Sequence, residues 1–178
     1  IENTRVALTV LLGRPSGDTD AMPDVRAIPA YGIYRENLEK GTRGSAVIVF
    51  YRSHLLAGDV APIDALADAL EQRGLLVTAI FVPSLKAPAA ADWLRCELKK
   101  IAPAVVVNAT AFAARDGDHA SPLDIADCPV LQVALTNASQ TLWERSQRGA
   151  GASDLAMHVV LPELDGRLFA GVVSFKEP

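Results

Sequence analysis

Short, continuously apolar segments alternate with amphipathic ones from residue 46 onward. Residues 46–51, AVIVFY, are apolar throughout and rich in β-branched side chains, which is typical of a strand buried on both faces. Residues 62–73 follow with apolar side chains at helical spacing, Pro62 in the first turn and Gly74 at the end. The same pattern predicts further strands at residues 75–82, 104–108, 129–135 and 168–175, and further helices at residues 88–101, 139–148 and 154–160.

This order of elements indicates an α/β protein with an open parallel sheet. Strand–helix–strand units with right-handed crossovers place helices on both faces, as in flavodoxin-like or Rossmann-like folds. Residues 46–178 are expected to form this parallel α/β domain. Residues 1–45 contain a short apolar run and then Gly-, Pro- and Asp-rich sequence, so we expect the end of a helix and a linker there.

Composition narrows the class of protein. Of the 178 residues, 50% are hydrophobic and 21% are charged, the net charge is −4, and no run of Lys or Arg occurs. We therefore expect no nucleic-acid partner, and no membrane partner because the apolar runs are too short to span a bilayer. Cys96 and Cys128 are far apart and form no C-x-x-C pair. This favours two buried, reduced thiols in a cytoplasmic protein over a zinc or iron–sulfur site.

Polar side chains follow each of the first four predicted strands. The carboxyl ends of parallel strands share one edge of the sheet, and open α/β sheets bind ligands beyond that edge. The residues are Arg52, His54 and Asp59 after the first strand, Ser84 and Lys86 after the second, Asn108 and Thr110 after the third, and Thr136 after the fourth. This edge is therefore the expected place for a ligand site.

Purely structural roles compete with functional ones for several of these residues. Arg52 and Asp59 could form a surface ion pair of little energetic value. Asp59 could equally belong to a turn that leads into a helix cap. Asn108 and Thr110 could simply bond the backbone at a strand end. The sequence leaves both alternatives open for each of them.

His54 has the side chain best suited to chemistry at this edge. It is predicted to lie in a loop among charged neighbours, where an imidazole can accept a proton or bind a metal near neutral pH. Lys86, taken alone, is explained by solvation. A second polar cluster surrounds the Pro/Gly turn at residues 161–167, where turn chemistry explains the Asp-Gly pair. Glu163 lies there between a Pro and a Leu, so its carboxylate could face a site.

Three common motifs of nucleotide-binding proteins and hydrolases are absent. The chain contains no G-x-x-x-x-G-K-[ST], no G-x-G-x-x-G after the first strand and no G-x-S-x-G. These absences exclude a P-loop, a standard dinucleotide fingerprint and the nucleophile elbow of serine hydrolases from this sequence.

The motifs at the strand ends resemble those of the large subunit of aerobic cobaltochelatase, the CobN type, which is similar to the large subunit of magnesium chelatase. The R-S-H-x-x-x-G-D and L-P-E-L-D-G elements are shared by both branches, whereas the Ser-Leu-Lys and Phe-Lys elements favour the cobalt branch. The resemblance runs from about residue 31 to the end and departs only where a Leu is expected after Gly149. The segments that carry it are residues 51–59, 84–86, 108–112, 129–132, 161–167 and 174–176.

The resemblance implies a fragment of a much larger subunit that binds a tetrapyrrole and a metal. A chain that begins with Ile1 rather than Met agrees with this expectation. The implied reaction inserts Co2+, as a substrate, into hydrogenobyrinic acid a,c-diamide during cobalamin synthesis. Separate AAA+-type ATPase subunits would use ATP and Mg2+, neither of which is expected to bind here. We expect the isolated fragment to be inactive.

Metal insertion releases protons from ring nitrogens, so a base must lie near the macrocycle. A carboxylate or a neutral imidazole can take the proton and can also hold the incoming ion. Our hypothesis gives His54 and Glu163 the metal and proton roles and Asp59 a supporting catalytic role. The predicted substrate-binding residues are Arg52, Ser84, Lys86, Asn108 and Thr110, with Arg52 or Lys86 as anchors for acid side chains.

Two other functions are compatible with the same sequence. The segment could be a non-catalytic scaffold of the large subunit or a module that docks its ATPase partners. It could also belong to a magnesium chelatase homologue. Macrocycle binding by the fragment separates the first alternative from the enzymatic hypothesis, and the metal preference of the complete complex separates the second.

Overall fold

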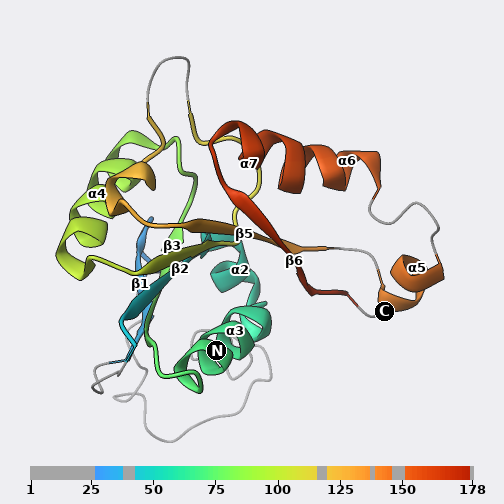
Figure 1. The fold of residues 1–178 in the computed structure, drawn as a ribbon, viewed down its shortest axis with the longest axis horizontal. Coiled ribbons are helices and arrows are strands. Elements are labelled where there is room, and N and C mark those ends of the chain that lie inside the picture. The colour runs from blue at the N-terminus through green and yellow to red at the C-terminus, as the bar shows by residue number, and fades with distance from the viewer. Residues whose placement is uncertain (1–26, 38–42, 116–119, 137–138, 146–150, 177–178) are drawn as a thin grey trace, which may run out of the picture.

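The structure, a computed structural model, describes residues 27–37, 43–115, 120–136, 139–145 and 151–176. The helix end predicted near residues 6–12 lies outside these ranges. Within them, six strands form one sheet in the order β1-β3-β2-β4-β5-β6 (Figure 1). The strands are β1 (Gly32–Glu36), β2 (Ser45–Tyr51), β3 (Leu76–Val82), β4 (Val105–Asn108), β5 (Val130–Leu135) and β6 (Leu168–Ser174).

The five strands β2 to β6 run parallel, as the sequence predicts. Numbered from β2, their order in the sheet is 2-1-3-4-5, which is the order of flavodoxin-like folds rather than of Rossmann folds. The change of direction in strand order lies between β2 and β4. The α/β fold class is therefore confirmed and narrowed to one of its two predicted topologies.

The sheet is not parallel throughout, because β1 pairs antiparallel with β3 at one edge. Residues 32–36 lie in the segment that the sequence predicts as a linker, and in the structure they form β1. The reason for this difference is the composition of the strand: β1 is short, carries two charged residues and is interrupted by a bulge between Ile33 and Arg35. Short, charged and bulged strands are common at sheet edges and give little hydrophobic pattern. Tyr34 anchors β1 through an edge-to-face contact with Phe50, with ring centroids 5.6 Å apart.

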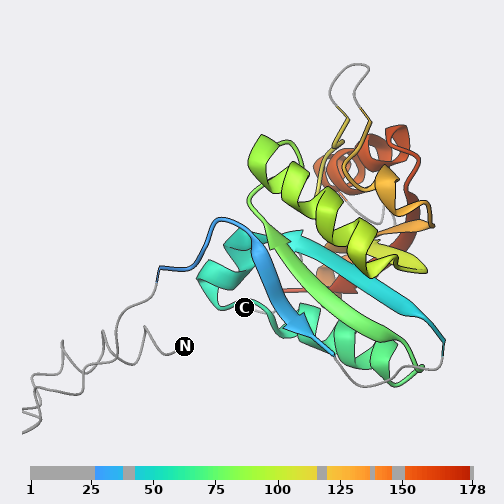
Figure 2. The ribbon, with the colours of Figure 1, turned by 90° about the vertical axis from the view of Figure 1, so that its left-hand side faces the viewer.

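Helices cover both faces of the sheet, as predicted (Figure 2). Alternate residues of β2 point to opposite faces. Ile48 and Phe50 pack in the core cluster that includes Ile63 of α3 (Ala61–Glu71). Val47 and Val49 pack in the other cluster, with Leu94 and Leu98 of α4 (Pro88–Ile101). All seven side chains are fully buried, so β2 contributes side chains to both layers of the core.

The predicted helix at residues 154–160 is longer than expected. A continuous helical segment runs through α6 (Ala152–Leu155), the π-helical η3 (Ala156–Val160) and α7 (Leu161–Leu164). Pro162 has no N–H to donate to the carbonyl of His158, and its ring would clash with that carbonyl in a regular α-helix. The wider π-helical turn directly before the proline relieves this conflict. Beyond the gap at residues 146–150, α5 (Gln140–Arg145) lies apart from this segment (Figure 1).

One expectation about the cysteines is wrong. Cys96 is exposed on α4, because its position on the helix faces solvent while Leu94 and Leu98 face the core. Cys128 is half-buried, and burial raises the pKa of its thiol. Among the described residues, no helix combines the length and the apolar character needed to cross a membrane.

Candidate functional site

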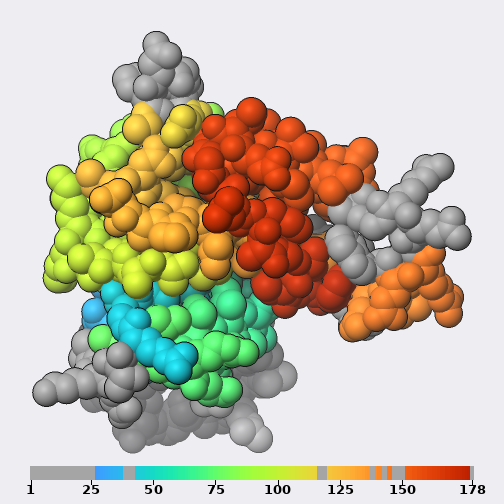
Figure 3. Space-filling model, in the orientation of Figure 1, coloured from blue at the N-terminus to red at the C-terminus, as the bar shows by residue number. Residues whose placement is uncertain are grey.

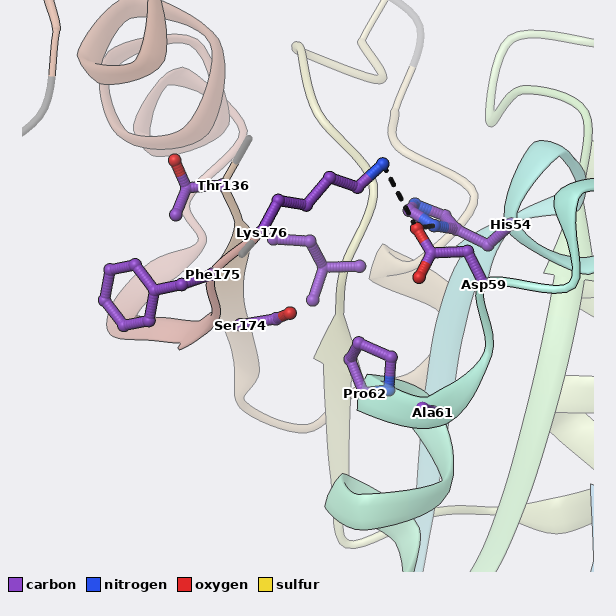
Figure 4. Close-up of a pocket in the computed structure, with 9 residues that line it drawn as sticks. His54, Asp59, Ala61, Pro62, Thr136, Ser174, Phe175 and Lys176 are labelled. Carbon is purple, nitrogen blue, oxygen red and sulfur yellow. Dashed lines mark ion pairs between the residues drawn. The ribbon is translucent and has the colours of Figure 1, made fainter. Parts of the chain in front are cut away.

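A pocket of about 300 Å³ opens at the carboxyl edge of the sheet, on the side covered by α3 (Figure 4). It joins the segment after β2 to the ends of β5 and β6, which are more than 70 residues away in the sequence. The lining residues are His54, Asp59, Ala61, Pro62, Leu135, Thr136, Ser174, Phe175 and Lys176. Three of the polar edge residues predicted from the sequence, His54, Asp59 and Thr136, therefore share one pocket.

A helix that the sequence did not predict brings His54 and Asp59 together. Residues 52–57 form α2 (Arg52–Ala57), which Gly58 ends in the left-handed conformation at φ 69°. The N–H of Asp59 donates to the carbonyl of His54 at 2.8 Å, and the N–H of Gly58 donates to the carbonyl of Leu55 at 3.2 Å. This pair of bonds is a Schellman motif, and it folds the chain back onto the helix. The His-x-x-x-Gly-Asp spacing therefore fixes Asp59 beside His54.

Three charged or titratable side chains meet in the pocket. Asp59 Oδ2 lies 3.7 Å from His54 Nδ1 and 3.4 Å from Lys176 Nζ. In Figure 4, Lys176 extends from the end of β6 across the pocket toward Asp59, and His54 lies beyond that carboxylate. One carboxylate oxygen thus has two nitrogen partners on opposite sides of the pocket.

Arg52 does not point to the pocket as a free anchor. Its Nε donates to the carbonyl of Pro29 and its guanidinium donates to the carbonyl of Ile28, both at 2.7 Å. These bonds tie the segment before β1 to α2. Asp59 pairs with Lys176 rather than with Arg52, the alternative that the sequence left open. The predicted contact of Arg52 with substrate stays a prediction.

Ser84 and Lys86 lie in the turn after β3 and do not line this pocket. The Ser84 hydroxyl accepts a hydrogen bond from the N–H of Lys86 at 3.1 Å, which stabilises the turn before α4. Lys86 itself is exposed. Their predicted contact with substrate stays a prediction.

Asn108 and Thr110 are fully buried rather than open to a ligand. The Asn108 amide donates to Gln132 Oε1 at 2.7 Å, and the Thr110 hydroxyl donates to Asn108 Oδ1 at 2.9 Å. The Gln132 amide in turn donates to the carbonyl of Thr110 at 2.7 Å. Nearby, the Tyr51 hydroxyl donates to the carbonyl of Ala111 at 2.8 Å. These bonds fix the loop after β4 against β2 and β5. The predicted contact of Asn108 and Thr110 with substrate stays a prediction.

A buried ion pair extends this polar network to the turn after α7. Arg167 donates to Asp165 Oδ2 at 2.6 Å, and it also donates to Gln132 Oε1 and the carbonyl of Phe112, each at 3.2 Å. Asp165 further accepts the backbone N–H groups of Ala114 and Arg115. Burial lowers the pKa of Arg167, and the Asp165 carboxylate opposes that shift. Asp165 therefore does more than form the expected turn.

Glu163 does not join His54. It is exposed in α7 and is absent from the residues that line the pocket. Among the described residues, no group of three or more His, Cys, Asp and Glu side chains has the geometry to hold a metal ion. What the pocket offers instead is an imidazole, from His54, and an ammonium group suited to an anion, from Lys176.

Comparison with known proteins identifies the family to which the chain is similar. It matches the family described as CobN/Magnesium Chelatase over residues 1–178. It is 43% identical over 147 residues to the aerobic cobaltochelatase subunit CobN of Sinorhizobium sp, and 36% identical over 135 residues to that of Pseudomonas aeruginosa. These alignments cover 81% and 75% of this chain but 11% of each relative.

The fold has a counterpart among solved structures. The catalytic subunit of cobaltochelatase from Mycobacterium tuberculosis superposes with a TM-score of 0.79, at 23% identity, over 99% of this chain and 16% of that one. At this level of identity the superposition shows the fold, whereas the family match and the identity with both CobN subunits show the relationship. The chain belongs to the CobN/magnesium chelatase family.

Proposed function

We propose that this chain is the part of an ATP-dependent cobaltochelatase large subunit that contacts the macrocycle during insertion of Co2+ into hydrogenobyrinic acid a,c-diamide. The observation that carries the proposal is the pocket in which His54, Asp59 and Lys176 meet at the carboxyl edge of a flavodoxin-like sheet. Ligands of such folds bind at this edge. The two CobN relatives, at 43% and 36% identity, favour cobalt over the magnesium branch of the family.

The chemistry assigned to this chain is proton transfer and substrate orientation. His54 accepts a proton released from a ring nitrogen as the ion enters, because a neutral imidazole is a base at neutral pH. Asp59 Oδ2 lies 3.7 Å from Nδ1, so a small movement of this carboxylate would let it accept the Nδ1 proton and leave Nε2 free to take the proton from the ring. Co2+, the substrate ion, accepts imidazole and carboxylate ligands, so His54 could also bind it transiently before it enters the ring.

Other parts of the complex complete the reaction. The chain spans 11% of each CobN relative, so most of such a subunit lies outside it. We assign ATP and Mg2+ to separate AAA+-type subunits, in line with the absence of a P-loop sequence here. The proposed place of action is the cytoplasm, and the 178-residue chain alone is expected to insert no cobalt.

The test uses the full-length subunit with its ATPase partners. His54→Ala is expected to lower the rate constant of cobalt insertion by about 10²- to 10⁴-fold, the usual loss for a general base. Lys99→Ala, on the exposed surface of α4, is the control and is expected to keep the wild-type rate. A His54→Ala rate within twofold of wild type would contradict the proposal.

Glu163→Gln in the same assay tests the second residue of the sequence hypothesis. A loss in this variant with an unchanged His54→Ala rate would move the proton role to α7. A scaffold or ATPase-docking role would be favoured if both variants kept the wild-type rate and the 178-residue chain alone did not bind the macrocycle.

A further inference from the structure

Lys176 follows β6 and faces the segment after α2. Its side chain is 59% exposed and its Nζ reaches Asp59 Oδ2 at 3.4 Å. From the sequence alone, the Phe-Lys element indicates only the cobalt branch of the family. In the structure this lysine closes one side of the pocket (Figure 4).

The Lys176–Asp59 ion pair is exposed and weak, so either side chain can bind another partner. Both side chains are more than one third exposed, at 59% and 37%, and exposed ion pairs contribute little to stability. Asp59 Oδ2 also faces His54 Nδ1 at 3.7 Å, which is too long for a hydrogen bond. A second anion can therefore replace Asp59 as the partner of Lys176 with little loss of free energy. The imidazole of His54 is then the remaining neighbour of the Asp59 carboxylate.

The rest of the pocket suits an organic acid better than a small inorganic anion. The apolar residues Pro62 and Leu135 also line the pocket, together with Phe175, whose ring points away from the Lys176 ammonium group (Figure 4). Its volume of about 300 Å³ corresponds to roughly ten water molecules. This room holds one carboxylate arm and the adjoining apolar ring edge, but not a whole tetrapyrrole.

We propose that Lys176 is the specificity residue that binds a carboxylate arm of the macrocycle. On binding, the arm replaces Asp59 as the partner of Nζ, and Asp59 turns to orient His54. His54 would then be oriented as a base only when the carboxylate arm of the correct substrate is bound to Lys176. This inference rests on the proposed function for the identity of the acid.

The experiment measures equilibrium binding to the full-length subunit by absorbance, with two probes. One is hydrogenobyrinic acid a,c-diamide and the other is its methyl ester, in which the free carboxylates are blocked. Lys176→Gln is expected to weaken binding of the acid roughly 10- to 100-fold, as for a lost charge-assisted hydrogen bond, and to leave the ester unchanged. Lys176→Arg restores most of the affinity, and Lys99→Gln is the matched exposed-lysine control.

Asp59→Asn distinguishes the contribution of Lys176 to substrate binding from the contribution of its ion pair with Asp59. Because the variant removes the competing carboxylate, it is expected to bind the acid at least as tightly as wild type while inserting cobalt more slowly. Equal losses for acid and ester in Lys176→Gln, no loss for either, or weak acid binding by Asp59→Asn would each overturn the inference. The proposed function is tested by a different measurement, the rate of cobalt insertion. A wild-type rate in His54→Ala would refute the proposed function independently of the binding results for Lys176→Gln.

Discussion

The Arg167–Asp165 pair provides the sharpest test of how this fold is held together. Both side chains are almost completely buried, at 2% and 0% exposure, and Arg167 donates to Asp165 Oδ2 at 2.6 Å. Replacing Arg167 with Met keeps much of the side-chain volume but removes every donor. The carboxylate of Asp165 then keeps only the backbone N–H groups of Ala114 and Arg115.

The expected cost of this change is large. Removing one partner of a buried pair typically destabilises a protein by about 3–5 kcal/mol, because the remaining charge is uncompensated. Whole domains have stabilities of about 5–15 kcal/mol. Arg95 and Asp92 provide a matched comparison, with nearly the same separation of 2.9 Å but exposures of 39% and 78%. Arg95→Met is expected to cost about 0.2–1 kcal/mol.

Urea unfolding of the 178-residue chain, followed by far-UV circular dichroism, measures both costs. The variant with both Arg167→Met and Asp165→Asn shows whether the loss belongs to the pair, since it leaves no buried charge. It is expected to be more stable than Arg167→Met alone. If Arg167→Met costs no more than Arg95→Met, the network does not hold the C-terminal segment as described.

Three further predictions concern single residues. Gly58→Ala should cost about 1 kcal/mol, since Gly58 has φ 69°, whereas Gly151→Ala at φ −60° should change stability little; urea midpoints measure both. Burial lowers the pKa of His158 below 6.5, so unfolding becomes easier as pH falls through 6.5, where only the unfolded chain takes up the proton; His158→Gln should flatten that acid limb. Tyr51→Phe removes two bonds to Ala111 and should cost about 1–3 kcal/mol in the same assay.

The buried parallel strands were predictable because their hydrophobic pattern has a direct physical cause. A strand covered on both faces must be apolar at nearly every position, as β2 and β3 are. Helix α3 was recognised from its apolar spacing and its terminal Pro and Gly. By contrast, β1 and α2 are short and partly exposed, and their formation depends on tertiary contacts such as the Tyr34–Phe50 ring contact.

The candidate site was predictable only where its chemistry is local in sequence. His54 and Asp59 lie in one short segment with only four residues between them, although the sequence did not predict the helix that brings them together. Lys176 could not be added, because the register of β6 in the sheet decides which side chain reaches the pocket. Gln132 offered one unused signal: it is a polar residue in the middle of an otherwise apolar strand, and such residues need buried partners.

The topology also explains why the pocket lies where it does. In a flavodoxin-like sheet the preferred ligand crevice opens where the strand order reverses, which here is between β2 and β4. Tyr51, Asn108 and Thr110 fill that position with hydrogen bonds to each other's loops. Opening that position to a ligand would break hydrogen bonds of the buried Asn108 and Thr110 and the half-buried Tyr51, which is costly. The pocket lies instead toward α3 and β6, where Lys176, from the segment after β6, faces His54 and Asp59 across it.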